Sequence, residues 1–187
     1  MIIDQMLDTI EYIHAKNVIH RDIKPANFVI GSSGNYDKLF LIDFGMALQY
    51  KNILTGAHIP YVTNKKRVGT VQYASLNDEL GNGQYRRDDM ESLAYMWIYF
   101  LKASLPWYNG KVRLSNADIL HIMLTTSTEE ICDGLPVEFV LYINYCRNLR
   151  FDEAPAYAHW KVKFRMLFHS LKYLYDGDFD WIKKIEH

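Results

Sequence analysis

The residues of this chain whose types and spacing best suit chemistry lie close together near its beginning. Asp22, Lys24 and Asn27 fall within one short segment, His20-Arg21-Asp22-Ile23-Lys24-Pro25-Ala26-Asn27, and Asp43 follows a little later. Phosphoryl transfer needs a carboxylate near the hydroxyl proton, a cation at the phosphate and hard oxygen ligands for Mg²⁺. We therefore predict Asp22 as the catalytic carboxylate, Lys24 as the phosphate contact, and Asn27 and Asp43 as metal ligands.

Each part of this pattern alone has an ordinary explanation. An Asp-Phe-Gly tripeptide such as Asp43-Phe44-Gly45 occurs by chance, and Lys24-Pro25 could be a plain turn. The ordered combination is more specific, because the segment 20–27 is followed by two short apolar runs and then by Ile42-Asp43-Phe44-Gly45. This order is typical of the protein-kinase motif set.

The surrounding elements should hold these groups in place. Apolar residues at helical spacing predict a helix over 2–16, and 28–30 and 39–42 resemble two strands joined by the turn Gly31-Ser32-Ser33-Gly34. Such a hairpin would bring Asn27 and Asp43 together. Residues 46–86 indicate a long loop, and long loops in compact domains are usually functional.

The rest of the chain is predicted to be helical. The chain looks helical from Asp88 onward, and residues 93–101 are apolar on nearly every face, which indicates a helix buried all round. Further helices are expected at about 116–125, 136–149 and 155–175. The predicted fold class is mainly α with a small β-hairpin, in one domain over residues 1–187.

Composition narrows the function classes. The chain has 187 residues, of which 49% are hydrophobic and 23% charged, and its net charge of −1 gives no global attraction to nucleic acid or to a membrane. We expect neither as a partner. No signal-peptide pattern opens the sequence, so the expected location is the cytosol, with the nucleus as an alternative. Cys132 and Cys146 fit no metal spacing; we interpret them as free thiols, with a disulfide as the weaker alternative.

Nearly the whole sequence resembles the casein kinase 1 family of serine/threonine protein kinases. The segments that carry this resemblance are Tyr12-Ile13-His14, 20–28, His58-Ile59-Pro60-Tyr61, 69–77, 86–93, Ser104-Leu105-Pro106-Trp107, 134–139, 149–152 and Phe179-Asp180-Trp181. Ala74-Ser75-Leu76-Asn77 stands where most kinases carry Ala-Pro-Glu, as is typical of this family. The vaccinia-related and tau-tubulin kinases share part of the pattern. The resemblance implies ATP and Mg²⁺ as cofactors and proteins as substrates.

Further roles follow from the resemblance at matching positions. The catalytic loop would be 20–27, the activation and substrate-binding segment 46–77, and the helical subdomain 86–175. Thr70 would hydrogen-bond Asp22 and Lys24, and Asp89 would hold the backbone of the catalytic loop. His20 and Phe44 would stack on each other, and Val29 would lie under the adenine.

A basic patch at Lys65, Arg67 and Lys111, with Lys66 and Arg113 nearby, would favour acidic or already phosphorylated substrates. A plain solvated surface is the equal alternative. Gln72 stands where the family usually has arginine, which weakens the preference.

The sequence also departs from a complete kinase. We find no glycine-rich loop, strand lysine or helix glutamate, and the first residues match the helix just before the catalytic loop. We therefore expect only the C-terminal lobe of a kinase-like fold, with the N-terminal β-lobe absent. Its apolar inter-lobe face would then be exposed and would need a partner. The alternative function is a catalytically weak or inactive lobe that binds substrates or regulators.

Overall fold

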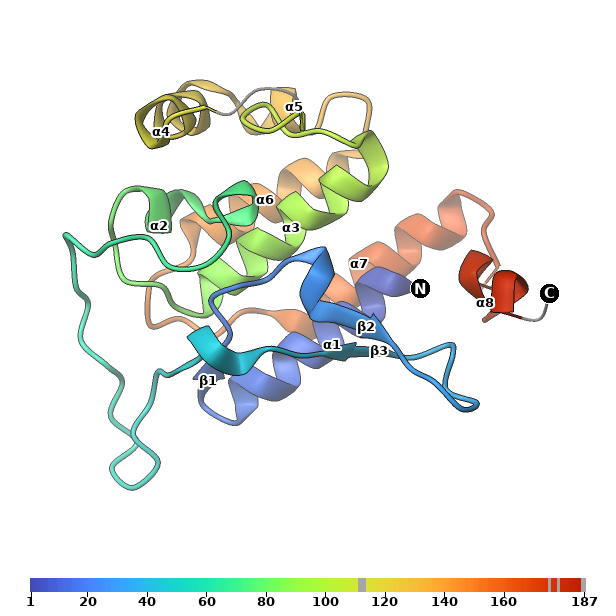
Figure 1. Ribbon diagram of the computed structural model, residues 1–187, viewed down its shortest axis with the longest axis horizontal. Helices are drawn as coiled ribbons and strands as arrows, with labels where there is room; N and C mark the ends of the chain where they lie inside the picture. Colours follow the sequence, from blue (N-terminus) through green and yellow to red (C-terminus); the bar gives the residue numbers. More distant parts are fainter. Residues whose placement is uncertain (111–113, 175, 178, 186–187) are drawn as a thin grey trace.

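The computed structural model describes residues 1–110, 114–174, 176–177 and 179–185 (Figure 1). It is mostly helical, with two small antiparallel sheets of two strands each. The α-helices are α1 Ile2–Ala15, α2 Leu76–Glu79, α3 Arg86–Lys102, α4 Asn116–Thr125, α5 Thr128–Ile131, α6 Val137–Asn148, α7 Tyr157–Ser170 and α8 Asp180–Ile185. The strands are β1 Val18–Ile19, β2 Phe28–Ile30, β3 Leu39–Leu41 and β4 Leu48–Gln49, and single 3₁₀ turns lie at Pro25–Asn27, Phe44–Met46 and Val71–Tyr73.

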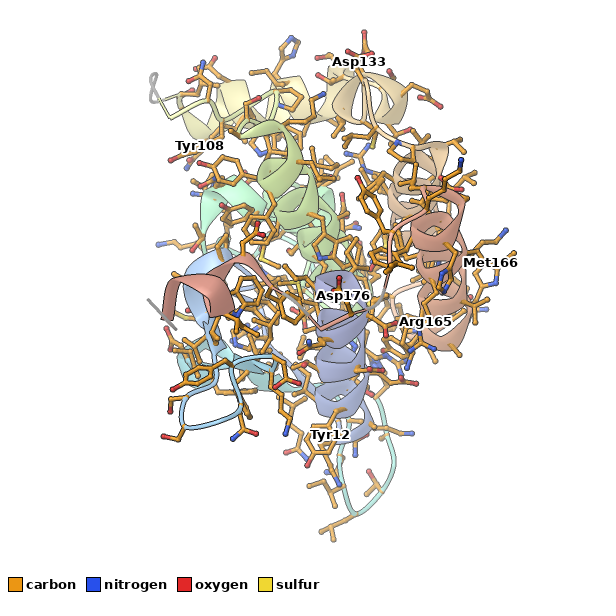
Figure 2. The ribbon with its side chains drawn as sticks, turned by 90° about the vertical axis from the view of Figure 1, so that its right-hand side faces the viewer. Tyr12, Tyr108, Asp133, Arg165, Met166 and Asp176 are labelled. Atoms are coloured by element: carbon orange, nitrogen blue, oxygen red, sulfur yellow. The ribbon has the colours of Figure 1, made fainter. Side chains whose placement is uncertain are left out.

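Helix α1 forms as its apolar spacing predicts. Met6, Leu7, Ile10 and Ile13 are buried on one face, while Tyr12 lies on the outer face near the end of the helix (Figure 2). The chain leaves the helix through Asn17, whose φ of 63° is the left-handed conformation that commonly ends helices. Strand β1 and the catalytic loop therefore follow directly after a helix that is anchored in the core.

The predicted hairpin is confirmed. Strands β2 and β3 pair antiparallel in the register Phe28↔Leu41, Val29↔Phe40 and Ile30↔Leu39. Gly31 is needed at the turn, because a Cβ there would lie 2.4 Å from the backbone oxygen of Asn35. A second pairing, β1 with β4, was not predicted and brings Gln49 back beside Val18.

Helix α3 lies at the centre of the helical part, packed against α1 and α6 (Figure 1). Its middle is buried as predicted, including Met90, Leu93 and Trp97. The expectation of burial all round is wrong for its last turn, where Phe100 is 49% and Leu101 58% exposed. The helix has left the core there and ends at Lys102.

The longer C-terminal helices are confirmed as α4, α6 and α7, although α7 ends at Ser170, short of the predicted residue 175. The short helices α2, α5 and α8 were not predicted, because four to six residues show no helical period. Two of them begin at a serine cap: Ser75 accepts a hydrogen bond from Asp78 N and Ser127 from Glu130 N. The predicted long loop over 46–86 is thus partly ordered by β4, the 3₁₀ turn and α2.

Both cysteines are buried free thiols, so the disulfide alternative is wrong. Burial raises the pKa of Cys132 to about 11 and that of Cys146 well above its ordinary value. Within the described residues, no helix has the length and apolar character needed to cross a membrane.

Candidate active site

The catalytic loop is the segment between β1 and β2, and buried polar groups fix its backbone. Asp89, in the first turn of α3, accepts hydrogen bonds from the backbone N–H of His20 at 2.7 Å and of Arg21 at 2.9 Å. The His20 ring lies against Phe44 at 5.0 Å between centroids. These are the contacts that the resemblance implied for Asp89, His20 and Phe44.

His20 also joins the two loops that carry the candidate groups. Its Nδ1 accepts from Asp22 N at 3.3 Å, so its Nε2 carries the proton and donates to the backbone oxygen of Ile42 at 3.0 Å. Ile42 N in turn donates to the backbone oxygen of Asn27 at 2.9 Å. The segment before Asp43 is therefore tied directly to the catalytic loop.

Asp22 is the most heavily bonded of the candidate side chains. One carboxylate oxygen accepts from the backbone N–H of Thr70 at 2.8 Å and from its hydroxyl at 2.7 Å, and the other faces Lys24 Nζ at 2.6 Å. Burial alone would raise the pKa of Asp22, but the bonds from Lys24 and Thr70 outweigh it and hold the pKa below its ordinary value. Asp22 is thus a carboxylate at neutral pH, able to accept a hydrogen bond from a hydroxyl.

Thr70 reaches Asp22 because Gly69 precedes it. Gly69 has a φ of 91°, and a Cβ there would lie 2.3 Å from the backbone oxygen of Arg21 and 3.1 Å from Asp22 Oδ1. Only glycine allows this close approach of the activation segment to the catalytic loop. Sequence reasoning gave Gly69 no role, although a glycine directly before Thr70 was the available signal. Thr70 thus bonds to Asp22 as predicted, whereas Lys24 is joined to Thr70 only through Asp22 among the described residues.

Asn27 and Asp43 lie at the open end of the hairpin, as predicted. Asn27 is buried, and its amide nitrogen donates to the backbone oxygen of Asp22 at 2.8 Å, which leaves the amide oxygen as the acceptor for a ligand. Asp43 is exposed and adopts a φ of 62°. It follows Ile42, the residue hydrogen-bonded to Asn27.

The donor set suits Mg²⁺, which is commonly held by one or two carboxylates together with substrate phosphates and water. Among the described residues, no group of three or more His, Cys, Asp and Glu side chains forms a ready-made metal site. Asn27 and Asp43 would therefore hold Mg²⁺ only together with a phosphate-bearing ligand.

Exposed apolar side chains continue from this site along the hairpin and beyond Asp43. Val29 is half-buried on β2, opposite Phe40. We call the exposed group around it the apolar strip; it consists of Ile30, Phe40, Ile42, Phe44, Met46 and Leu48. An exposed apolar face is thus present beside the candidate site, while its identity as an inter-lobe face and the partner that would cover it stay predictions.

The basic residues near the candidate site differ in part from the patch predicted from the sequence. Arg67 binds Glu79 through two bonds of 2.8 and 3.0 Å, so its charge is already balanced. Lys65 and Lys66 are exposed, and they line a cavity of about 270 Å³ together with Arg21. Lys111 and Arg113 lie outside the described residues. Arg21 is the basic residue that the sequence reasoning missed, although it directly precedes Asp22.

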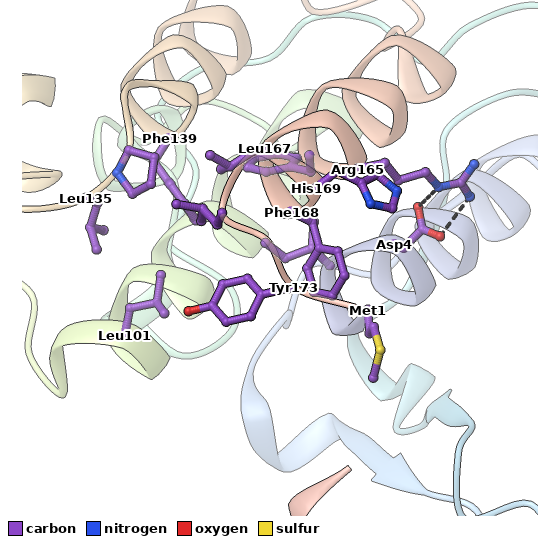
Figure 3. Close-up of a pocket in the computed structure, with 14 residues that line it drawn as sticks. Met1, Asp4, Leu101, Leu135, Phe139, Arg165, Leu167, Phe168, His169 and Tyr173 are labelled. Carbon is purple, nitrogen blue, oxygen red and sulfur yellow. Dashed lines mark hydrogen bonds and ion pairs between the residues drawn. The ribbon is translucent and has the colours of Figure 1, made fainter. Parts of the chain in front are cut away.

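A larger cavity of about 840 Å³ lies elsewhere, between α1, α3, α6 and α7 (Figure 3). Its wall is mainly apolar, with Leu101, Phe139 and Tyr173 among the lining residues and the Asp4–Arg165 ion pair beside it. It contains none of the predicted catalytic or metal-binding residues. We place the candidate active site at the catalytic loop, because the residues suited to phosphoryl transfer converge there. The size of a cavity alone does not indicate catalysis.

The chain was compared with models of known protein families. The family model described as "Protein kinase domain" matches residues 1–148. The matched part contains the catalytic loop, Asp43, Thr70 and the central helix α3, and it ends with α6.

Proposed function

The chain belongs to the protein kinase family, and we propose that it is a serine/threonine kinase resembling casein kinase 1. It would transfer the γ-phosphoryl group of ATP to serine or threonine hydroxyls of proteins. The observation that carries this proposal is the convergence on Asp22: Thr70, Lys24 and Asn27 all bond to this residue.

In this proposal Asp22 accepts the hydrogen bond of the substrate hydroxyl and orients its oxygen towards the phosphorus. Thr70 keeps the carboxylate of Asp22 fixed, and the backbone oxygen of Asn27, at the end of the catalytic loop, holds the segment before Asp43 through Ile42 N. Lys24, which is bound to Asp22, would shift its ammonium group to the transferred phosphate when nucleotide enters. Such positioning supplies most of the catalysis in phosphoryl transfer.

Asn27 and Asp43 would hold Mg²⁺ bound to ATP, and Val29 would contact the adenine side of the nucleotide. The bound metal would neutralise charge on the phosphate oxygens. The apolar strip borders this site, and we propose that a complementary protein surface covers it during catalysis. A half-covered nucleotide would bind weakly, because electrostatic stabilisation is strongest where water is excluded.

Protein substrates with an acidic or phosphorylated residue near the acceptor hydroxyl best fit the cations beside the candidate site. Lys65, Lys66 and Arg21 supply three cations around the small cavity beside the activation segment. Arg67 would add little there, because Glu79 already binds it.

The direct test is turnover by the purified protein. Casein and labelled Mg-ATP should yield phosphoserine or phosphothreonine, and Asp22→Asn should abolish this at unchanged fold. Asp133→Asn is the matched control, because Asp133 is an exposed carboxylate far from the catalytic loop (Figure 2). Turnover that persists in Asp22→Asn, or product found only on tyrosine, would contradict the proposal.

The second candidate function is a binding module, and the exposure of the apolar strip favours it. A kinase lobe of this kind would bind substrates or regulators without turnover. Calorimetric binding of casein, without any product even when Mg-ATP is saturating, would decide for this function.

A further inference from the structure

Asp89 is a buried carboxylate with three hydrogen bonds, and only two of them belong to the catalytic loop. Besides His20 N and Arg21 N, its Oδ2 lies 2.9 Å from Nε2 of His14. His14 belongs to α1 and is fully enclosed, with 1% of its surface exposed. The carboxylate that holds the catalytic loop is therefore itself bonded to His14, a residue of α1.

The backbone that Asp89 holds is strained next to the catalytic residue. Arg21 has a φ of 68°, a left-handed conformation that non-glycine residues rarely adopt. Its N–H is bonded to Asp89, and its guanidinium Nε donates to the backbone oxygen of Met46 at 2.6 Å. Strained conformations of this kind persist only where surrounding bonds fix them. The direction in which Asp22 leaves the backbone thus depends on Asp89.

The protonation of His14 follows from its neighbours. A carboxylate can only accept, so His14 must carry its proton on Nε2 to bond Asp89. Its Nδ1 then presents a lone pair, and the hydroxyl of Tyr157 lies 2.6 Å from it. Tyr157 is therefore the donor.

The other groups facing His14 agree with a neutral ring. The Tyr50 hydroxyl donates to the backbone oxygen of His14, and the cation of Arg86 lies against Tyr50. Burial and Arg86 lower the pKa of His14 against the opposing effect of Asp89, which keeps the imidazole neutral.

Tyr157 comes from the other end of the chain. It is the first residue of α7, which packs along α1, and it lies beyond the part that matches the kinase family model (Figure 1). We propose that Tyr157 is a positioning residue for phosphoryl transfer: by donating to Nδ1 of His14 it holds the imidazole ring in place, and Nε2–H of His14 then completes the bonds of Asp89 that hold the catalytic loop. This inference rests on the proposed kinase function.

The substitution Tyr157→Phe removes one oxygen and keeps the ring. His14 Nδ1 would then be buried without a donor, and the ring would no longer be held from that side, so its bond from Nε2–H to Asp89 would loosen. The matched control is Tyr145→Phe. The Tyr145 hydroxyl accepts from Ala156 N, so this variant also loses a hydrogen bond at the start of α7 but does not touch His14.

The first readout is independent of activity. Nitrogen NMR of the imidazole rings should show the neutral Nε2–H tautomer of His14 in all three proteins, with the resonance of the unprotonated Nδ1 shifted in Tyr157→Phe only, because that nitrogen loses its donor. The amides of His20 and Arg21 should exchange with solvent roughly tenfold faster in Tyr157→Phe only. A wild-type Nδ1–H tautomer would overturn the proposal, and that spectrum decides even if Tyr157→Phe fails to fold.

The second readout is the division between kcat and KM with Mg-ATP and casein. Tyr157→Phe should lower kcat roughly tenfold, the effect of about one lost hydrogen bond, while both KM values stay within about twofold. An equal loss of kcat in Tyr145→Phe would overturn the positioning role in favour of a general effect of α7. If the wild type shows no turnover, the kinase proposal fails alone, and unchanged amide exchange in Tyr157→Phe would then refute the positioning role separately.

Discussion

Gly69 should tolerate no side chain for two reasons, the backbone strain at its positive φ and the clash of an added Cβ. A second glycine of the chain, Gly34, separates the two effects. Gly69 has a φ of 91°, and a Cβ there would lie 2.3 Å from the backbone oxygen of Arg21. That oxygen cannot retreat, because Arg21 is held by Asp89. Gly34, in the hairpin turn, has a φ of 89° with nothing within 4 Å of an added Cβ. Gly34→Ala therefore introduces the backbone strain alone, and Gly69→Ala introduces the strain and the clash.

The magnitudes follow from these two terms. A side chain forced into a left-handed conformation costs about 1–2 kcal/mol, which is the loss expected for Gly34→Ala. Overpacking adds about 1–3 kcal/mol, so Gly69→Ala should lose roughly 2–5 kcal/mol of unfolding free energy. If the protein relieves the clash by moving Thr70, Asp22 loses two hydrogen bonds and kcat falls by about tenfold or more.

Urea unfolding of the wild type and both variants measures the first effect, and casein phosphorylation by the folded variants measures the second. Gly34→Ala should keep its kcat, because the hairpin turn lies outside the candidate site. Unfolding free energies of the two variants that agree within about 0.5 kcal/mol, with equal kcat, would refute the argument from close approach.

Three further predictions concern charged groups. Burial raises the pKa of Asp78 to about 6, so between pH 4 and 6 the unfolded state ionises first and stability falls as pH rises. Urea unfolding from pH 4 to 8 should show that the wild type loses up to about 3 kcal/mol more than Asp78→Asn, and equal losses in the two proteins would contradict this. Arg147→Met should lower the unfolding free energy by about 3–5 kcal/mol, because Glu91, bound to Arg147 at 3.1 Å, would stay buried without a counter-charge. Adding Glu91→Gln to this variant should restore part of the loss, and losses that simply add up in the double variant would refute a stabilising ion pair. Thr70→Val removes the hydrogen bond from the Thr70 hydroxyl that lowers the pKa of Asp22. The acid limb of the pH profile of kcat/KM should therefore move to higher pH in Thr70→Val and stay in place in Thr70→Ser.

Local patterns explain the parts of the structure that the sequence predicted well. The apolar spacing of α1 and the two strands around Gly31 are short-range signals, and both elements form where expected. Asp22, Lys24 and Asn27 share one loop, so their proximity needs no knowledge of the tertiary fold. Their roles in catalysis stay predictions until turnover is measured.

The parts that the sequence could not predict depend on distant residues. The contact between His14 and Tyr157 joins α1 to α7, and no period or motif links the two positions. The pairing of Arg67 with Glu79 likewise arises from the packing of α2, a helix too short to be seen in the sequence. The role of Gly69 required the position of Arg21, which is set by Asp89 from another helix.

The pairing of β1 with β4 has a consequence for the order of folding. Because Gln49 returns to Val18, residues 18–49 form a closed segment that contains Asp22, Lys24, Asn27 and Asp43. The β2–β3 hairpin inside it pairs residues that are closer in sequence than Asp22 is to Thr70 or Arg21 is to Asp89, and contacts that are closer in sequence form earlier. Thr70 and Asp89 must arrive from outside this segment, so we expect a folding chain to gather its catalytic side chains before it gains the bonds that align them. Pulsed hydrogen exchange during refolding would show this as protection of the β2–β3 amides before those of Arg21 and Thr70.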